Sequence, residues 1–322
     1  MANLTSQTMQ EKDFSKVTSA QKAFKIAGTV LNYAFLLVVA ISVLLPFYWM
    51  LISSVKTLAE YRSDPPTLIP LEFHFENYLF AFQQVNLVTL FKNTIIVGVV
   101  STLLSLVITI LAAYAFARLE FKGKNALFAA LLSTMMIPGE LFTITNFQTL
   151  AKFQDTYFIL IVPFMVSVFY IYLLRQNFLQ VPNELYLAAK VDGTSDFKYL
   201  WKVMIPLALP TIISITILKM MGSWNTYAWP NLVINKEEMQ LITQGIRNAG
   251  FKFEINYDGF AAVPIEILTL TDKWGDLIYT SEMSNIPIQM AAVSIVSLPL
   301  FIVFICFRKY IMKGVSRSGI KG

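Results

Sequence analysis

Apolar segments, each close to the length of a membrane-spanning helix, recur along this chain. There are six of them, at residues 26–52, 94–117, 126–150, 157–174, 204–227 and 286–307. A helix needs about 20 apolar residues to cross a bilayer. Only 14% of the 322 residues are charged, whereas soluble domains carry about 25%. The sequence therefore predicts an all-α integral membrane protein with six transmembrane helices.

The distribution of lysine and arginine predicts the orientation of these helices. If the N-terminus is inside, sixteen of these residues fall in inner segments and eight in outer segments. Positive residues are enriched on the cytoplasmic side of membrane proteins. We therefore expect cytoplasmic tails at both ends, at residues 1–25 and 308–322. The net charge of +5 follows from this sidedness and gives no reason to expect a nucleic-acid partner.

Few residue types suited to catalysis are available. The chain has one cysteine, Cys306, and one histidine, His74, which leaves no intrachain disulfide and no cysteine-rich metal site. The stretch 122–125 lacks the first glycine and the hydroxyl of a phosphate-binding loop. We expect no catalytic residues, no metal and no cofactor on this chain. An ion-coupled secondary transporter remains an alternative, although such proteins have internal repeats that are not evident here.

The predicted inner loop, at about 175–203, reads as a pair of short helices. Pro182 can begin a helix, because its missing N–H is not needed in the first turn. Gly193 can end that helix in the left-handed conformation, and the following Thr-Ser-Asp supplies caps for a second helix. The small residues Ala188 and Ala189 allow close approach of another surface. An amphipathic hairpin lying on the membrane is the alternative interpretation.

This loop resembles the cytoplasmic signature loop of permease subunits in binding-protein-dependent ABC importers. The residues that match are Pro182, Glu184, Leu185, Ala188, Ala189, Asp192, Gly193, Ile205 and Pro210. Leu187 stands where the family usually has glutamate, which puts any ionic contact of that glutamate in question. Further short matches, to the carbohydrate-uptake class of maltose and multiple-sugar permeases, follow in the expected order at 45–50, 53–56, 76–78, 93–94, 112–118, 121–123, 224–225 and 314–322.

The resemblance implies a permease that forms half of the pathway for a sugar or oligosaccharide in a bacterial or archaeal cytoplasmic membrane. Its expected partners are a second homologous permease, a dimer of cytoplasmic ATP-binding subunits that hold ATP and Mg, and an extracellular solute-binding protein. Import of a non-sugar solute, such as a glycerol phosphate, is the alternative within the family.

The resemblance also assigns residues. The expected coupling helix, which would contact the ATPase, includes Glu184, Leu185, Ala188, Ala189, Asp192 and Gly193. The C-terminal tail, with Gly319, Lys321 and Gly322, would contact the ATPase too, and a solvated basic end is its alternative. Side chains of the kind that sugar sites use include Tyr114, Asn146, Gln148 and Trp224, but none of them is assigned to the substrate.

The chain divides around one insertion. The predicted core spans 26–249, the last helix lies within 283–307, and between them 250–282 forms an outer segment longer than this class usually has. That segment is too rich in apolar residues for a disordered tether. We expect a small folded cap, which either docks the solute-binding protein or packs on this subunit or its partner.

Two charges fall inside predicted spans. Glu140 and Lys219 each lie about 15 residues from the inner end of a span, which places both roughly 22 Å deep at 1.5 Å per residue. Charges at that depth are costly unless they pair or face water. We expect the two residues to pair or to line one translocation cavity. The alternatives are that Lys219 snorkels outward, or that Pro138-Gly139 breaks the helix and leaves Glu140 in water.

Overall fold

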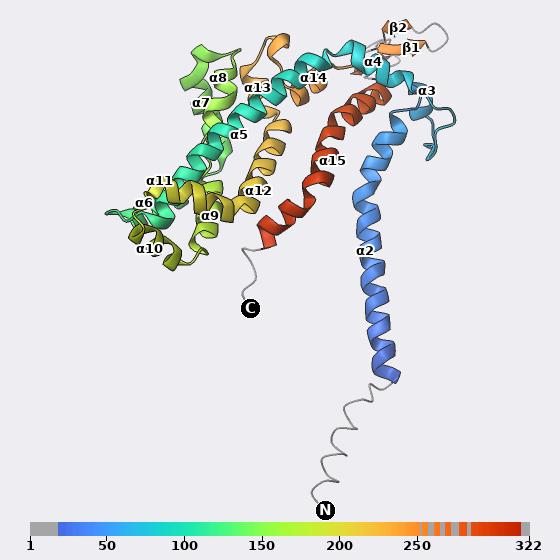
Figure 1. Cartoon of the computed structure of the whole chain (residues 1–322). Helices are drawn as coiled ribbons and strands as arrows, with labels where there is room; N and C mark the ends of the chain where they lie inside the picture. The colour runs from blue at the N-terminus through green and yellow to red at the C-terminus, as the bar shows by residue number, and fades with distance from the viewer. Residues whose placement is uncertain are drawn as a thin grey trace, which may run out of the picture.

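The computed structural model describes residues 19–316, apart from 252, 257–260, 265–267, 272–276 and 282–284, and the side chains of 24–251 and 285–309. Within this part, the chain is an elongated arrangement of helices with two small β-hairpins (Figure 1). The predicted tail residues Gly319, Lys321 and Gly322 lie outside the described residues.

Four helices are long and apolar enough to cross a membrane. They are α2 (Ser19–Ser53), α5 (Leu87–Arg118), α12 (Ile205–Trp224) and α15 (Ile286–Ser316). Two short elements, α11 (Asp196–Tyr199) and the π-helical turn η4 (Leu200–Met204), lead directly into α12. These four helices coincide with the first, second, fifth and sixth apolar segments of the sequence.

The third and fourth apolar segments are bent. The third consists of α6 (Lys124–Thr134), η1 (Gly139–Leu141), α7 (Phe142–Leu150) and η2 (Ala151–Phe153), with a bend of 79° after α6. The fourth consists of α8 (Tyr157–Ile161), η3 (Val162–Phe164) and α9 (Val168–Leu179), with a bend of 46°. Pro138 contributes to the first break, because proline has no N–H to donate and disfavours a helical residue before it. The described helices thus give four candidate spans, or six if each bent pair is one span.

Short elements gather at the end of the molecule opposite the start of α2 (Figure 1). They are α3 (Leu58–Tyr61), α4 (Glu76–Gln84), α13 (Ala228–Val233), η5 (Glu237–Met239) and α14 (Ile242–Asn248). Buried residues of α4, α5, α14 and α15 form one core cluster there, which includes Phe80, Leu90, Ile242 and Ile288.

The expected all-α fold does not extend through the insertion. Strands β1 (Phe253–Asn256) and β2 (Ala261–Pro264) form one antiparallel hairpin, and β3 (Leu268–Thr271) and β4 (Leu277–Ser281) form another. Apolar and polar residues alternate in β1 and β3, as the two-residue period of a strand requires. The insertion begins and ends at one place, because the backbone N–H of Asn285 donates to the carbonyl of Phe251 at 2.7 Å.

Polar residues near the start of α5 fasten it to the segment after α13. The Asn93 side chain donates to the carbonyl of Glu238 at 2.8 Å and accepts from the hydroxyl of Tyr157 at 2.6 Å. The Thr94 hydroxyl accepts from the backbone N–H of Ile242 at 2.9 Å. Asn93 and Thr94 are buried, and buried polar groups in folded proteins are nearly always hydrogen-bonded. These two residues therefore fix the start of α5 to the segment that follows α13.

Helix α2 stands apart from most of the bundle (Figure 1). It packs on α15, where the rings of Phe47 and Phe301 meet edge to face with centroids 5.4 Å apart. In the described chain, none of the residues in the most apolar stretch of α2 is buried. Lipid or another subunit must therefore cover this helix.

Candidate functional site

The predicted inner loop folds as expected around α10 (Asn183–Val191). Gly193 has φ +68°, in the left-handed region that favours glycine. Its N–H donates to the carbonyl of Lys190 at 3.0 Å, and the N–H of Thr194 donates to the carbonyl of Ala189 at 2.8 Å. These two bonds form a Schellman cap, which satisfies carbonyls that the helix end would otherwise leave open. The turn after α10 is thus fixed by one glycine.

Helix α10 lies on the same side of the molecule as the start of α2 and the end of α15 (Figure 1). The structure describes every residue of α10, and none of them is buried. Of the predicted coupling residues, Ala189 is half-buried, and the exposed ones are Glu184, Leu185, Ala188, Asp192 and Gly193. Leu187 and Val191 are 55% and 89% exposed. Residues four apart share a helix face, so α10 presents an apolar stripe to its surroundings.

Asp196 connects α10 to α5. Its Oδ1 accepts from the hydroxyl of Tyr186 in α10 at 2.8 Å and from that of Tyr114 in α5 at 3.3 Å. Its Oδ2 accepts from Nζ of Lys190, also in α10, at 2.9 Å. The rings of Tyr186 and Tyr199 meet edge to face with centroids 5.3 Å apart. One carboxylate therefore joins the exposed helix to a helix of the membrane core.

These contacts also affect titration in the loop. The hydrogen bond to the carboxylate of Asp196 raises the pKa of Lys190 above its ordinary value. Burial, and then the hydrogen bond to the same carboxylate, raises the pKa of Tyr186. Both side chains therefore keep their protons at neutral pH, and the cluster stays assembled.

Arg118, the last residue of α5, makes a second connection to this loop. It is buried, and its Nη2 donates to the carbonyls of Phe178 at 2.9 Å and Val181 at 2.5 Å. Its Nη1 donates to the side-chain oxygen of Asn183, the first residue of α10, at 3.3 Å. The planar guanidinium suits several acceptors at once. Arg118 at the end of α5 thus binds the segment that leads into α10.

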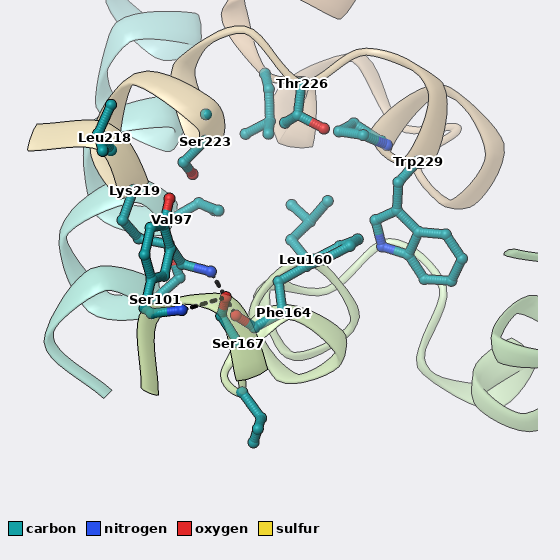
Figure 2. Close-up of a pocket in the computed structure, with 15 residues that line it drawn as sticks. Val97, Ser101, Leu160, Phe164, Ser167, Leu218, Lys219, Ser223, Thr226 and Trp229 are labelled. Atoms are coloured by element: carbon teal, nitrogen blue, oxygen red, sulfur yellow. Dashed lines mark hydrogen bonds between the residues drawn. The ribbon is translucent and has the colours of Figure 1, made fainter. Parts of the chain in front are cut away.

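The second feature is a cavity of about 390 Å³ near the C-terminal end of α12. Figure 2 shows the side chains that line it. They come from four stretches of the chain, 97–101, 160–170, 218–230 and residue 241, and include Ser101, Phe164, Ser167, Lys219, Ser223 and Trp229. Nζ of Lys219 donates to the carbonyl of Phe164 at 2.5 Å. The indole N–H of Trp229 donates to the carbonyl of Ile159 at 2.9 Å, which holds the ring against the cavity.

The structure separates the two charges that we expected to meet. Lys219 lines the cavity, but Glu140 does not. Glu140 is exposed on the short turn η1, and no ion pair joins it to Lys219 among the described residues. Our depth estimate assumed one straight helix over 126–150, whereas α6 ends at Thr134 and the chain turns before Glu140. The structure therefore contradicts the expected ion pair and shows the helix break before Glu140 that the alternative assumed. The expectation that both residues line one translocation pathway stays a prediction.

The residue types expected in a sugar site lie elsewhere. Tyr114 is buried and donates to Asp196, Trp224 packs on Phe91 with ring centroids 5.7 Å apart, and neither lines the cavity. Asn146 and Gln148 do not line it either. Sequence reasoning missed Trp229 and the hydroxyl residues around Lys219. Their positions are far apart in the chain, and no spacing connects them.

Comparisons with known proteins place this architecture in one family. The pattern of the family described as "binding-protein-dependent transport system inner membrane component" matches residues 94–317. The chain is 29% identical to the arabinooligosaccharides transport system permease protein AraQ of Halalkalibacterium halodurans, over 94% of this chain and 99% of that one. It is 27% identical to AraQ of Bacillus subtilis, over 93% and 96% of the two chains.

Its fold resembles that of a chain from the crystal structure of a bacterial ABC transporter involved in the import of the acidic polysaccharide alginate. The TM-score is 0.71 at 24% identity, over 91% of this chain and 98% of that one. The family pattern covers well over half of the chain and includes both the loop around α10 and the cavity. This chain therefore belongs to the inner membrane components of binding-protein-dependent transport systems.

Proposed function

We propose that this chain is the permease subunit of an ABC importer that carries a sugar or oligosaccharide, and that α10 is its coupling helix. The observation that carries the proposal is the build of α10: a short helix without a buried residue, with a fixed cap, joined to α5 by Asp196 and Arg118. A helix held in this way moves as a body with the element to which it is attached. The AraQ proteins are named for arabinooligosaccharides, and this likeness supports a saccharide as substrate.

The membrane topology that we propose has six spans, with each bent pair counted as one, and both termini in the cytoplasm. The positive-inside distribution supports it, as does the common side on which α10, the start of α2 and the end of α15 lie (Figure 1). In this orientation the apolar stripe of Leu187 and Val191 faces the cytoplasm. The stripe supports seating of α10 in a partner by apolar contact, without the glutamate that the family usually has where this chain has Leu187.

The partners that we propose are a second homologous permease, two cytoplasmic ATP-binding subunits and an extracellular solute-binding protein. ATP and Mg would be bound by the ATP-binding subunits, and this chain would carry out no covalent chemistry. The basic tail with Gly319, Lys321 and Gly322 would reach the same ATP-binding subunits. The exposed apolar surface of α2 supports a partner permease, because one subunit leaves this helix largely uncovered.

Substitution at Gly193 tests the coupling role. The assay is ATP hydrolysis by the complete importer in proteoliposomes, with and without its sugar-loaded binding protein. In Gly193→Trp the side chain would disturb the cap and the surface that seats in the ATPase, so we expect normal assembly and no stimulation by the binding protein. Gly123→Trp is the matched control: Gly123 also has a positive φ, +79°, and a Cβ atom at either glycine would meet nothing within 4 Å.

Two outcomes would contradict the proposal. Normal stimulation in Gly193→Trp would show that α10 does not transmit the signal. Equal loss in Gly123→Trp would show that backbone strain at any left-handed glycine of this surface suffices, and that contact through α10 is not needed.

A further inference from the structure

The cavity beside α12 is lined by one positive side chain and by no negative one among the described residues. Of the fifteen described residues that line it, Lys219 is the single charged one, and none is acidic. The remaining polar groups are mostly hydroxyls, and the walls are aromatic and aliphatic. A volume of about 390 Å³ falls in the range of roughly 300–1,000 Å³ that small-molecule sites occupy. The cavity is therefore large enough for a ligand and has one positive group to offer it.

Lys219 is half-buried, and its ammonium group is bound to the backbone of the protein. It lies on α12, five residues before that helix ends at Trp224. Its Nζ donates to the carbonyl of Phe164, the last residue of η3, across the cavity wall (Figure 2). This bond fixes the ammonium group at the break between η3 and α9. An ammonium group has three donors, and the bond to Phe164 uses one of them, which leaves donors for a ligand.

The broken fourth span adds positive potential beside the ammonium group of Lys219. Helix α9 begins at Val168 after its N-cap Ser167, and Ser167 and Tyr170 line the cavity. The N-terminus of a helix carries a partial positive charge. Half-helix N-termini point at the anionic groups of substrates in several transporter folds. The helix end supports the same preference as Lys219, since both favour a negative group in the cavity beside the break.

We infer that this cavity binds the carboxylate of an acidic saccharide, such as a uronate-containing oligosaccharide, with Lys219 as the residue that selects for charge. This inference rests on the proposed function and specifies its substrate. The ammonium group of Lys219 donates to the carboxylate, the hydroxyls of Ser101 and Ser223 face the sugar hydroxyls, and Trp229 offers an aromatic face.

The test compares charged and neutral sugars of one length in the complete importer. Proteoliposomes loaded with ATP, with the binding protein outside, are given trigalacturonate or a neutral galactose trisaccharide, and uptake is measured. We expect Lys219→Met to lower uptake of trigalacturonate roughly tenfold to a hundredfold, as for loss of one charged hydrogen bond, and to change uptake of the neutral sugar less than about twofold. Lys219→Arg should retain the preference, because it keeps the charge. Lys92→Met is the matched control, an exposed lysine of α5 outside the cavity.

Each result decides between the inference and its rivals. Equal loss for both sugars in Lys219→Met, with rescue by Lys219→Arg, would mean that the bond to Phe164 only stabilises the helix break, and would overturn the inference. An effect that follows the anionic lipid content of the vesicles would assign Lys219 to a lipid headgroup and would overturn it too. Uptake of the neutral sugar alone by the unaltered importer would overturn the inference and leave the proposed function standing. Uptake of no saccharide, with another solute accepted, would overturn the proposed function itself.

Discussion

Replacing Arg118 with methionine would keep the unbranched stem of this buried side chain but remove its hydrogen bonds. Three bonds are lost at the junction between α5 and α10: two to backbone carbonyls, at 2.9 and 2.5 Å, and a longer one to Asn183, at 3.3 Å. Charged hydrogen bonds contribute about 1.5–3 kcal/mol each, and the longest of the three should contribute least. We therefore expect Arg118→Met to lower the free energy of unfolding by about 3–5 kcal/mol.

Two measurements check this expectation. Thermal unfolding of the detergent-solubilised complex should shift downward by roughly 5–10 °C. Trypsin should cleave faster after Lys190, because the segment that leads into α10 is no longer held. In both measurements, Arg118→Lys should give values between those of the unaltered protein and of Arg118→Met, since one ammonium cannot reproduce the geometry of a guanidinium. Lys202→Met, which removes an exposed lysine near the same loop, should change neither measurement.

The reasoning about Arg118 is refuted by one clear result. If Arg118→Met unfolds within about 1 °C of the unaltered protein and Lys190 is cleaved no faster, the three bonds do not hold the loop, whatever their geometry. A double-mutant cycle with Asn183→Ala refines the account. The coupling energy should stay below about 1 kcal/mol, because the bond between these two side chains is long.

Two further predictions concern Asp155 and the two β-hairpins. Asp155 has φ +55° and accepts from the backbone N–H groups of Lys236 and Asn235, which hold the pKa of its carboxyl below the ordinary 3.8. Its stabilisation is therefore complete above the ordinary pKa and is lost as the pH falls through the lowered value. Asp155→Asn should lower the free energy of unfolding by on the order of 1 kcal/mol at pH 7 and by less below pH 4. Thermal unfolding of both proteins at a series of pH values measures this. A difference between them that does not change with pH would exclude the charge of Asp155 as the cause. The hairpins can be deleted by replacing 253–281 with a short linker, because Phe251 and Asn285 are adjacent. If the hairpins dock the loaded binding protein, the deletion should weaken the importer's apparent affinity for it. An unchanged affinity would mean that the hairpins are a packing cap.

Local sequence signals were sufficient for the loop around α10. Gly193 adopts the left-handed conformation that glycine favours, and Ser195 is the N-cap of α11, where its hydroxyl accepts from the backbone N–H of Lys198. The six apolar segments also correspond to helical elements, because hydropathy reflects the length that a membrane imposes.

Hydropathy could not show where a span breaks. Pro46, Pro210 and Pro299 remain inside α2, α12 and α15, whereas Pro138 lies at a bend of 79°. All four lie inside apolar segments of the sequence, so the residue type alone does not distinguish a tolerated proline from a break. The assumption of an unbroken helix over 126–150 placed Glu140 at the same depth as Lys219.

The cavity and the role of Asp196 depended on distant contacts. The lining residues come from four separate parts of the chain, and Tyr114 reaches Asp196 from a helix that ends long before it in sequence. Tyr114 and Arg118 lie in one of the short matches to the sugar permeases, at 112–118, but that match assigns no role to either residue. The structure shows that both residues connect α5 to the loop around α10.

The partnership of α2 with α15 has a consequence for biosynthesis. The ribosome makes α2 first and α15 last, so α2 must wait in the lipid as a solitary helix until the rest of the polypeptide has been translated. During this interval its apolar surface suits the bilayer, but its contact through Phe47 has no counterpart until Phe301 emerges. A chain truncated before α15 would therefore leave α2 without the helix on which it packs.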